Sequence, residues 1–180
     1  FVGRLNEQKG VEYLIKSLSI VAKKISGVRL VIVGEGDHKS KLQSVAKENN
    51  VLNLVEFKGP VSKEKLPEIY SSCDVFVLPS VTTKIGTEAM GLVLIEAMAC
   101  QLPVIGSSSG GIKDVIQDGK NGLIFEEKNH TELADKIIKI LSDEKLSAKL
   151  SANGALFAKN NFSWEIIGSK FEKLYRDVLK

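Results

Sequence analysis

The sequence is short of several features that assign a function by themselves. It has two cysteines, Cys73 and Cys100, one tryptophan, and a formal net charge of only +3. Two cysteines at this spacing give neither a disulfide framework nor a zinc site, so we expect two buried thiols, which suits a reducing, cytoplasmic compartment. The small net charge lacks the strongly basic character of nucleic-acid-binding proteins, so we expect no nucleic-acid partner.

Long apolar runs are also missing. The longest ones, such as Leu30 to Val33 and Val75 to Leu78, are far shorter than the roughly 20 residues that a membrane helix needs. The first residues show no signal-peptide pattern. We therefore expect no membrane span. Peripheral contact of a full-length protein with the cytoplasmic face of a membrane stays open, because a charge of +3 is too small to decide it.

The length of 180 residues and the 43% of hydrophobic residues predict one well-buried domain. The chain starts at Phe1 without an initiator methionine, and Phe1-Val2-Gly3 is typical of the last residues of a strand. Because strands of roughly five residues are usual, we expect these 180 residues to be a fragment of a longer protein.

Short apolar strands alternate with amphipathic helices along most of the chain. Residues 11–25 have the 3.6-residue period of a helix with one buried face. Further strands are expected at 29–33, 53–57, 74–78, 103–105 and 122–125, with helices at 37–48, 63–72, 91–99 and 111–116, and then at 131–141, 144–159 and 163–179. This order predicts an α/β, Rossmann-like doubly wound fold: a mainly parallel sheet of about six strands, helices on both faces and a helical C-terminal end.

In open parallel sheets, ligands bind beyond the C-terminal ends of the strands, so the loops that follow the strands are the candidate sites. The first loop places Arg4 and Lys9 just before a helix. A guanidinium fork, a mobile ammonium and the free N–H groups at the start of a helix together can hold an anion. Taken alone, however, the pair fits two solvated loop charges as well.

The second and third loops carry weaker patterns. Gly34-Glu35-Gly36 links a strand to a helix as a dinucleotide fingerprint does, but Lys39 stands where that fingerprint has its third glycine. A tight glycine turn is therefore favoured over a dinucleotide site. In the third loop, Gly59-Pro60 ends a strand, and the backbone around Val61 could pair with the edge of a base or could be a simple turn.

The fourth loop, which runs into the helix at 91–99, gives the sharpest pattern. Gly91 permits close approach of a ligand, and the N–H groups of Gly91, Leu92 and Val93 favour a phosphate. Glu96 lies one and a half turns inside an otherwise apolar helix, where a carboxylate is costly unless it is paired or given hydroxyl donors, such as those of a ribose diol. Glu88 precedes the helix on the ligand side, where it can accept sugar hydroxyls or balance developing positive charge.

Together these residues resemble the C-terminal, donor-binding domain of retaining GT-B glycosyltransferases of family 4, the group 1 transferases. The family's glutamate pair with seven residues between is matched by Glu88 and Glu96, and its opening motif by Gly3-Arg4-Leu5 with Lys9-Gly10. Further matches are Gly34-Glu35-Gly36, Phe57-Lys58-Gly59-Pro60-Val61, Pro79-Ser80, Pro103-Val104-Ile105, Gly110-Gly111-Ile112 and Asp118-Gly119-Lys120-Asn121-Gly122-Leu123. Two positions depart from the family, which usually has glycine where this chain has Ala89 and Gln101.

The resemblance implies a role for each candidate residue. Arg4 and Lys9 would hold the donor diphosphate and offset charge on the departing nucleotide, and the amides of Leu92 and Val93 would bind the phosphate nearest the sugar. Glu96 would bind the ribose hydroxyls and Glu88 the transferred sugar. The backbone around Val61 would bind the base. The implied reaction moves a sugar, of hexosyltransferase type, from a nucleotide-diphosphate sugar with retention of anomeric configuration.

The resemblance also implies what surrounds this domain. Residues 1–180 would be the donor-binding C-terminal half of a GT-B fold, without the N-terminal acceptor domain and therefore inactive alone. The acceptor would be a sugar, lipid or glycan in polysaccharide or glycolipid biosynthesis, with no metal and no cofactor beyond the donor. The last helix would reach across to the acceptor domain. A GT-B epimerase or synthase, a dinucleotide-binding oxidoreductase domain and a non-catalytic nucleotide-binding subunit stay open as alternatives.

Overall fold

The computed structural model describes residues 1–179, and every strand pairing in it is parallel. One sheet has the order β1-β2 and the other β3-β4-β5. The strands are β1 (Leu30–Val33), β2 (Val55–Gly59), β3 (Phe76–Leu78), β4 (Val104–Ser107) and β5 (Leu123–Phe125). The α/β class and the parallel pairing are confirmed.

The expected count of about six strands in one sheet is wrong, because five strands form two sheets. The missing strand is the segment Phe1–Gly3. It pairs in parallel with β1 through a bridge between Val2 and Val33, and the N–H of Gly3 donates to the carbonyl of Val33 at 3.0 Å. The interpretation of this segment as strand-like therefore holds, but a single bridge is too short to count as a strand.

The helices follow the predicted order with shifted ends. They are α1 (Val11–Val21), α2 (Lys39–Glu48), α3 (Leu66–Ser71), α4 (Leu92–Ala99), α5 (Ile112–Val115), α6 (His130–Ser142), α7 (Glu144–Phe162) and α8 (Trp164–Val178), with 3-10 turns η1 (Glu7–Lys9), η2 (Leu52–Leu54) and η3 (Lys63–Lys65). The helix predicted over 11–25 ends at Val21 and continues as turns to Gly27. The helix predicted over 63–72 begins only at Leu66, because Pro67 is tolerated only in a first turn.

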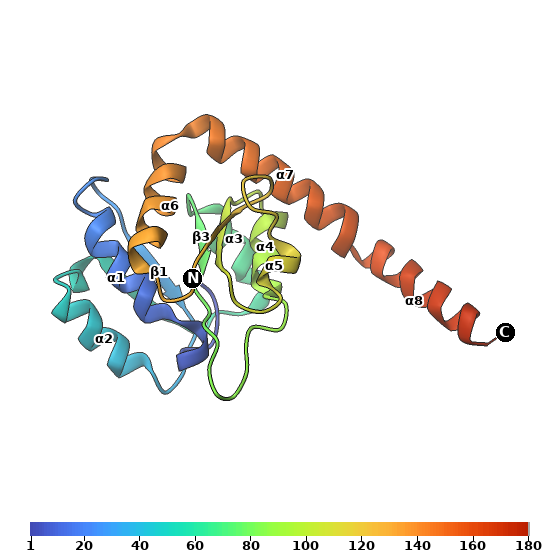
Figure 1. The fold of residues 1–180 in the computed structure, drawn as a ribbon, viewed down its shortest axis with the longest axis horizontal. Coiled ribbons are helices and arrows are strands. Elements are labelled where there is room, and N and C mark those ends of the chain that lie inside the picture. Colours follow the sequence, from blue (N-terminus) through green and yellow to red (C-terminus); the bar gives the residue numbers. More distant parts are fainter. Residues whose placement is uncertain (180) are drawn as a thin grey trace.

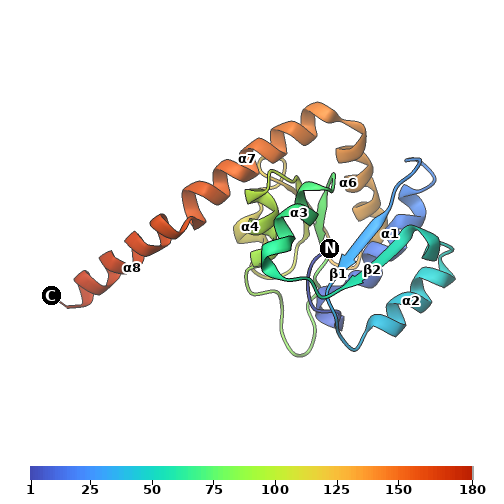
Figure 2. The same cartoon turned by 180° about the vertical axis from the view of Figure 1, so that it is seen from behind.

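Helices cover the strands from two sides. Figure 1 shows α1 and α6 in front of the strands, and Figure 2, seen from behind, shows α3 and α4 on the opposite side. The core between these layers is built from large side chains that are fully buried, among them Leu5, Ile15, Ile32, Leu78, Leu94, Met98, Ile105, Ile112 and Phe125. These layers fix the ends of the strands and therefore the loops that leave them.

The last helix stands apart from this core. Figures 1 and 2 both show α8 projecting from the body beyond α7. None of its residues is buried, and Trp164 is 87% exposed. Its other exposed apolar side chains are Phe171, Leu174, Tyr175, Val178 and Leu179. Within residues 1–179, no helix has the length and apolar content to cross a bilayer.

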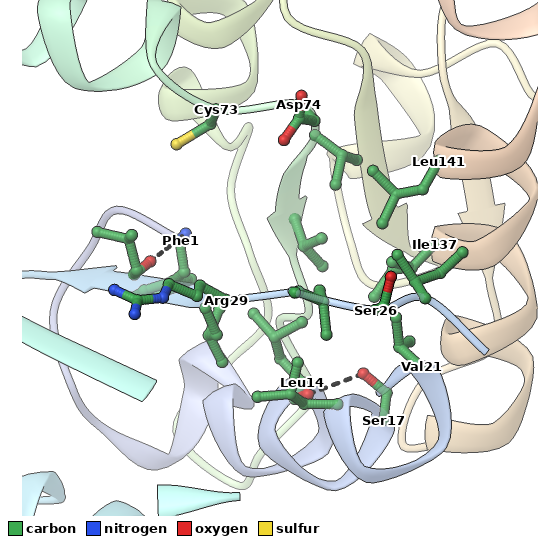
Figure 3. Close-up of a pocket in the computed structure, with 18 of the residues that line it drawn as sticks. Phe1, Leu14, Ser17, Val21, Ser26, Arg29, Cys73, Asp74, Ile137 and Leu141 are labelled. Atoms are coloured by element: carbon green, nitrogen blue, oxygen red, sulfur yellow. Dashed lines mark hydrogen bonds between the residues drawn. The ribbon is translucent and has the colours of Figure 1, made fainter. Parts of the chain in front are cut away.

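A cavity of about 520 Å³ lies where β1 and β3 begin (Figure 3). Its lining includes Phe1, Arg29, Cys73 and Ile137. The amino group of Phe1 is buried there and donates to the carbonyl of Val31 at 3.0 Å. Burial lowers the pKa of this amino group from 8.0 to about 6, although Cys73 opposes the shift. The cavity is at the end of the strands away from the loops that carry the candidate site.

Candidate functional site

Two loops that are distant in sequence meet at the carboxyl ends of the strands. The turn η1 packs against the loop that follows β3, as the dark blue and green segments show in Figure 1. The N–H of Val81 donates to the carbonyl of Gln8 at 2.8 Å, and the side-chain amide of Gln8 donates to the carbonyl of Thr87 at 2.6 Å. The first and fourth candidate loops are therefore one structural unit.

An ion pair lies at the centre of this unit. Nζ of Lys9 is 2.6 Å from Oε2 of Glu88, and the hydroxyl of Ser80 donates to the same oxygen at 2.8 Å. Glu88 is only 9% exposed, so its carboxylate would be costly without these two donors. Ser107 supports the arrangement by donating its hydroxyl to the carbonyl of Ser80. Two predicted site residues are thus in direct contact.

Arg4 is exposed and lies five residues before Lys9 in the first loop. It lines an open cavity of about 490 Å³ together with Glu35, Gly36 and Lys39. Sequence reasoning treated Lys39 only as a departure from a fingerprint, whereas the structure places it in the same cavity as Arg4. This part of the site therefore presents two cations and one carboxylate.

The glycines of the second loop are explained by close backbone packing. A Cβ on Gly34 would lie 1.9 Å from the carbonyl oxygen of Gly3, and one on Gly36 would lie 2.1 Å from that of Leu5. The N–H of Leu5 donates to the carbonyl of Glu35 at 2.8 Å. The second loop thus braces the first and holds the backbone of Arg4, as a tight glycine turn does.

Helix α4 begins at the edge of the site. Gly91 has a φ of 73°, and a Cβ there would lie 2.8 Å from Cδ2 of Leu78, so glycine is required for the helix to start against β3. Within residues 1–179, the N–H groups of Leu92 and Val93 have no protein acceptor. These free donors and the helix dipole favour an anion at this position.

Glu96 differs from its expected environment. It is exposed rather than deeply buried, because the carboxylate lies on the side of α4 that faces away from the core. Its partner is Tyr70 on α3, whose hydroxyl donates to Oε2 of Glu96 at 2.9 Å. Sequence reasoning missed Tyr70, although a tyrosine on the apolar face of a helix needs an acceptor for its hydroxyl and was a usable signal.

The loop after β4 supports the backbone of Glu88. The N–H of Gly111 donates to the carbonyl of Glu88 at 2.9 Å. A Cβ on Gly110 would lie 2.2 Å from the same carbonyl oxygen, and one on Gly111 would lie 1.9 Å from that of Ala89. The Gly110-Gly111 pair therefore lets the loop after β4 reach the glutamate, a role that the sequence did not reveal.

Val61 is not bonded to the other candidate residues. It is half-buried in the loop after β2, and no hydrogen bond or ion pair joins it to Arg4, Lys9, Glu88 or Glu96 among residues 1–179. Its role toward a base stays a prediction. In the same part of the chain, no group of three or more histidine, cysteine, aspartate or glutamate side chains has the arrangement of a metal site.

Residues 1–157 match the family described as glycosyl transferases group 1. The chain belongs to this family. It is 30% identical over 177 residues to the GDP-mannose-dependent alpha-(1-6)-phosphatidylinositol monomannoside mannosyltransferase of Mycobacterium tuberculosis, covering 97% of this chain and 46% of that one. The chain thus spans about half the length of the curated relatives it matches.

Solved structures show the same fold. The C-terminal domain of a group 1 family protein from Francisella tularensis is similar with a TM-score of 0.80 and 28% identity, covering 90% of this chain and 84% of that one. S. aureus TarM, in a structure that contains UDP, has a TM-score of 0.82 and 27% identity, covering 97% of this chain and 34% of that one. The recognised family and the Rossmann-like fold are therefore confirmed.

The close packing of the first loop against the loop after β3 predicts that one added methyl group at Gly10 lowers the stability of the fold. Gly10 has a φ of 60°, and a Cβ there would lie 2.0 Å from the carbonyl oxygen of Pro79. We expect Gly10→Ala to lower the free energy of unfolding by about 1 to 3 kcal/mol more than Gly27→Ala does. Gly27 is the matched control, since its φ is 72° and nothing lies within 4 Å. Urea denaturation measures both variants. Equal losses in the free energy of unfolding would show that the contact with Pro79 does not add to the cost of Gly10→Ala.

Proposed function

We propose that this chain is the donor-binding domain of a retaining glycosyltransferase that transfers a sugar from a nucleotide-diphosphate sugar to an acceptor. The observation that carries the proposal is that the loops at the carboxyl ends of the strands hold three kinds of group that can bind an anion: Lys9 in its pair with Glu88, the exposed Arg4, and the free N–H groups at the start of α4. The structure of the relative TarM contains UDP, which supports a nucleotide ligand.

Each feature has a part in the proposed reaction. Breaking the bond to the anomeric carbon leaves negative charge on the diphosphate, and fixed cations at that point stabilise the transition state. Arg4 and Lys9 supply these cations, and the amides of Leu92 and Val93 hold the phosphate nearest the sugar. Because protein cations fill this role, we propose that transfer needs no metal and no cofactor beyond the donor. Glu88 then accepts hydroxyls of the transferred sugar.

The nucleoside part of the donor extends toward the second and third loops. We propose that Glu96 accepts the ribose hydroxyls, since its carboxylate is exposed at the α4 edge of the site. The backbone around Val61 pairs with the base. Backbone contacts of this kind use no protein side chain to distinguish uracil, guanine and adenine, so they do not select one nucleotide.

We further propose that the whole protein has a second, acceptor-binding domain, which α8 contacts. The exposed apolar side chains of α8, which include Trp164 and Leu174, have no partner within residues 1–179. A face of this kind is typical of an interaction surface. The acceptor is a sugar, lipid or glycan, and the protein works in the cytoplasm, with peripheral contact at the membrane face where the acceptor is a lipid. A GT-B epimerase or synthase would use the same donor site and differ on the acceptor side.

Calorimetric titration of the chain with UDP, GDP and ADP, first without metal and then with a chelator, tests the proposal. We expect one diphosphate to bind in both conditions. Arg4→Ala and Glu96→Ala should each weaken that binding by about tenfold or more, because each removes a hydrogen bond to a charged group. Arg176→Ala, at an exposed arginine on α8, is the matched control and should leave binding unchanged. Binding that needs a metal, or that survives both site changes, contradicts the proposal.

The ion pair predicts an unusual result for Glu88. In the free protein, Glu88 neutralises Lys9 and also repels a diphosphate. Glu88→Gln keeps the shape of the side chain and removes the charge, so we expect the bound nucleoside diphosphate to gain about threefold to tenfold in affinity.

The same titration measures this gain, with Glu172→Gln on α8 as the control for loss of one surface carboxylate. Unchanged or weaker binding of the diphosphate to Glu88→Gln would mean that Lys9 does not take part in holding it.

A further inference from the structure

We propose that Tyr70 is a positioning residue for the nucleotide: its hydroxyl holds the carboxylate of Glu96 in the orientation that accepts the ribose hydroxyls, and thereby sets the preference for ribonucleotides. This inference rests on the proposed function, in which Glu96 binds ribose. Tyr70 itself does not touch the ligand. The hydroxyl of Tyr70 donates to Oε2 of Glu96 at 2.9 Å, between two neighbouring helices, α3 and α4 (Figure 2).

The two partners differ strongly in burial. Tyr70 is 2% exposed, and its ring packs edge-on against the ring of Phe76, with the centroids 5.6 Å apart and the ring planes at 75°. The hydroxyl is therefore fixed by the core. Glu96 is exposed, and an exposed glutamate loses rotamer freedom when it binds a ligand. The hydrogen bond to the buried ring therefore restricts the orientation of the exposed carboxylate.

The chemistry of the hydroxyl suits this role. Burial, followed by the negative charge of Glu96, raises the pKa of Tyr70, so the hydroxyl keeps its proton and donates. It uses one acceptor position of Oε2 and leaves Oε1 and the rest of Oε2 free. Two adjacent hydroxyls of a ribose can donate to these positions. Tyr70 thus orients the carboxylate without competing for all of its capacity.

The test compares ligands that differ only in the ribose hydroxyls. The chain, its Tyr70→Phe variant and its Glu96→Ala variant are titrated with UDP and with 2′,3′-dideoxy-UDP, or with the GDP or ADP pair where one of those bases is preferred. We expect Tyr70→Phe to weaken binding of the ribonucleotide by about fivefold to tenfold and to change binding of the dideoxynucleotide by less than about twofold. Tyr175→Phe, on exposed α8, is the matched control.

A double-mutant cycle adds a second criterion. In the Glu96→Ala background, Tyr70→Phe should cause no further loss for either ligand, because a residue that acts only through Glu96 has nothing left to orient. Equal losses for the two ligands, or full additivity with Glu96→Ala, would overturn the inference and assign Tyr70 a purely structural role.

The outcomes separate this inference from the proposed function. If Glu96→Ala affects both ligands equally, or if no nucleoside diphosphate binds, the ribose role of Glu96 fails and the inference fails with it. If Glu96→Ala is specific for the ribonucleotide and Tyr70→Phe is not, only the inference fails. Should Tyr70→Phe not fold, the hydroxyl proton of Tyr70 gives an independent readout by NMR. Its resonance should shift on addition of the ribonucleotide and not of the dideoxynucleotide, and an absent or equal shift overturns the inference.

Discussion

The packing of the first loop against the loop after β3 is the constraint on which the rest of the site depends. It brings Lys9 to Glu88 across 79 positions of the sequence and buries most of the carboxylate between them. Gly10 makes this possible, because its missing side chain leaves room for the carbonyl of Pro79. A charge pair at 2.6 Å in a place of low exposure needs further polar contacts, and Ser80 supplies a second hydrogen bond to the same oxygen of Glu88.

The same principle of close backbone approach recurs around the site. The loop after β1 braces the first loop through Gly34 and Gly36, and the loop after β4 supports Glu88 through Gly110 and Gly111. Glycines at these points serve packing between loops as much as access for a ligand. The charged side chains are therefore held by backbone that is itself buried or hydrogen-bonded, and this preorganisation is what electrostatic catalysis requires.

The sequence predicted the fold class and the order of the elements, because these follow from periodicity and from the direction of parallel strands. The first residues of α6, α7 and α8 were close to their predicted positions, since Asn129, Asp143 and Ser163 cap the N-terminal ends of the three helices with their side chains. The number of strands was overestimated, because whether a paired segment counts as a strand depends on its neighbours and not on its own residues.

Pairings between distant side chains were beyond sequence reasoning. Glu96 was expected to be buried from the apolar residues around it, but the direction of one side chain depends on the rotation of α4 against the core, which periodicity defines only coarsely. Tyr70 was missed because its acceptor, the carboxylate of Glu96, lies 26 positions away in the sequence. Conversely, Gln101 has a φ of 58° just after α4, where the family usually has glycine, so the backbone keeps a left-handed turn even when the residue type does not favour it.

In one part of the site the polar groups have hydrogen-bond partners from the chain, and in the other part they have none among the described residues. At Glu88, the chain supplies partners for the side chain and for the backbone: Lys9 and Ser80 donate to the carboxylate, and the N–H of Gly111 donates to the carbonyl. Around Arg4 and the start of α4, the donors face solvent and lack protein acceptors within residues 1–179. An anion that enters finds fixed donors in this second part, while Lys9 is already engaged. In the proposed donor complex, binding therefore has to draw Lys9 away from Glu88 or share it, and we propose that the charge that Glu88 regains becomes available for a sugar hydroxyl or for positive charge that develops on the sugar ring.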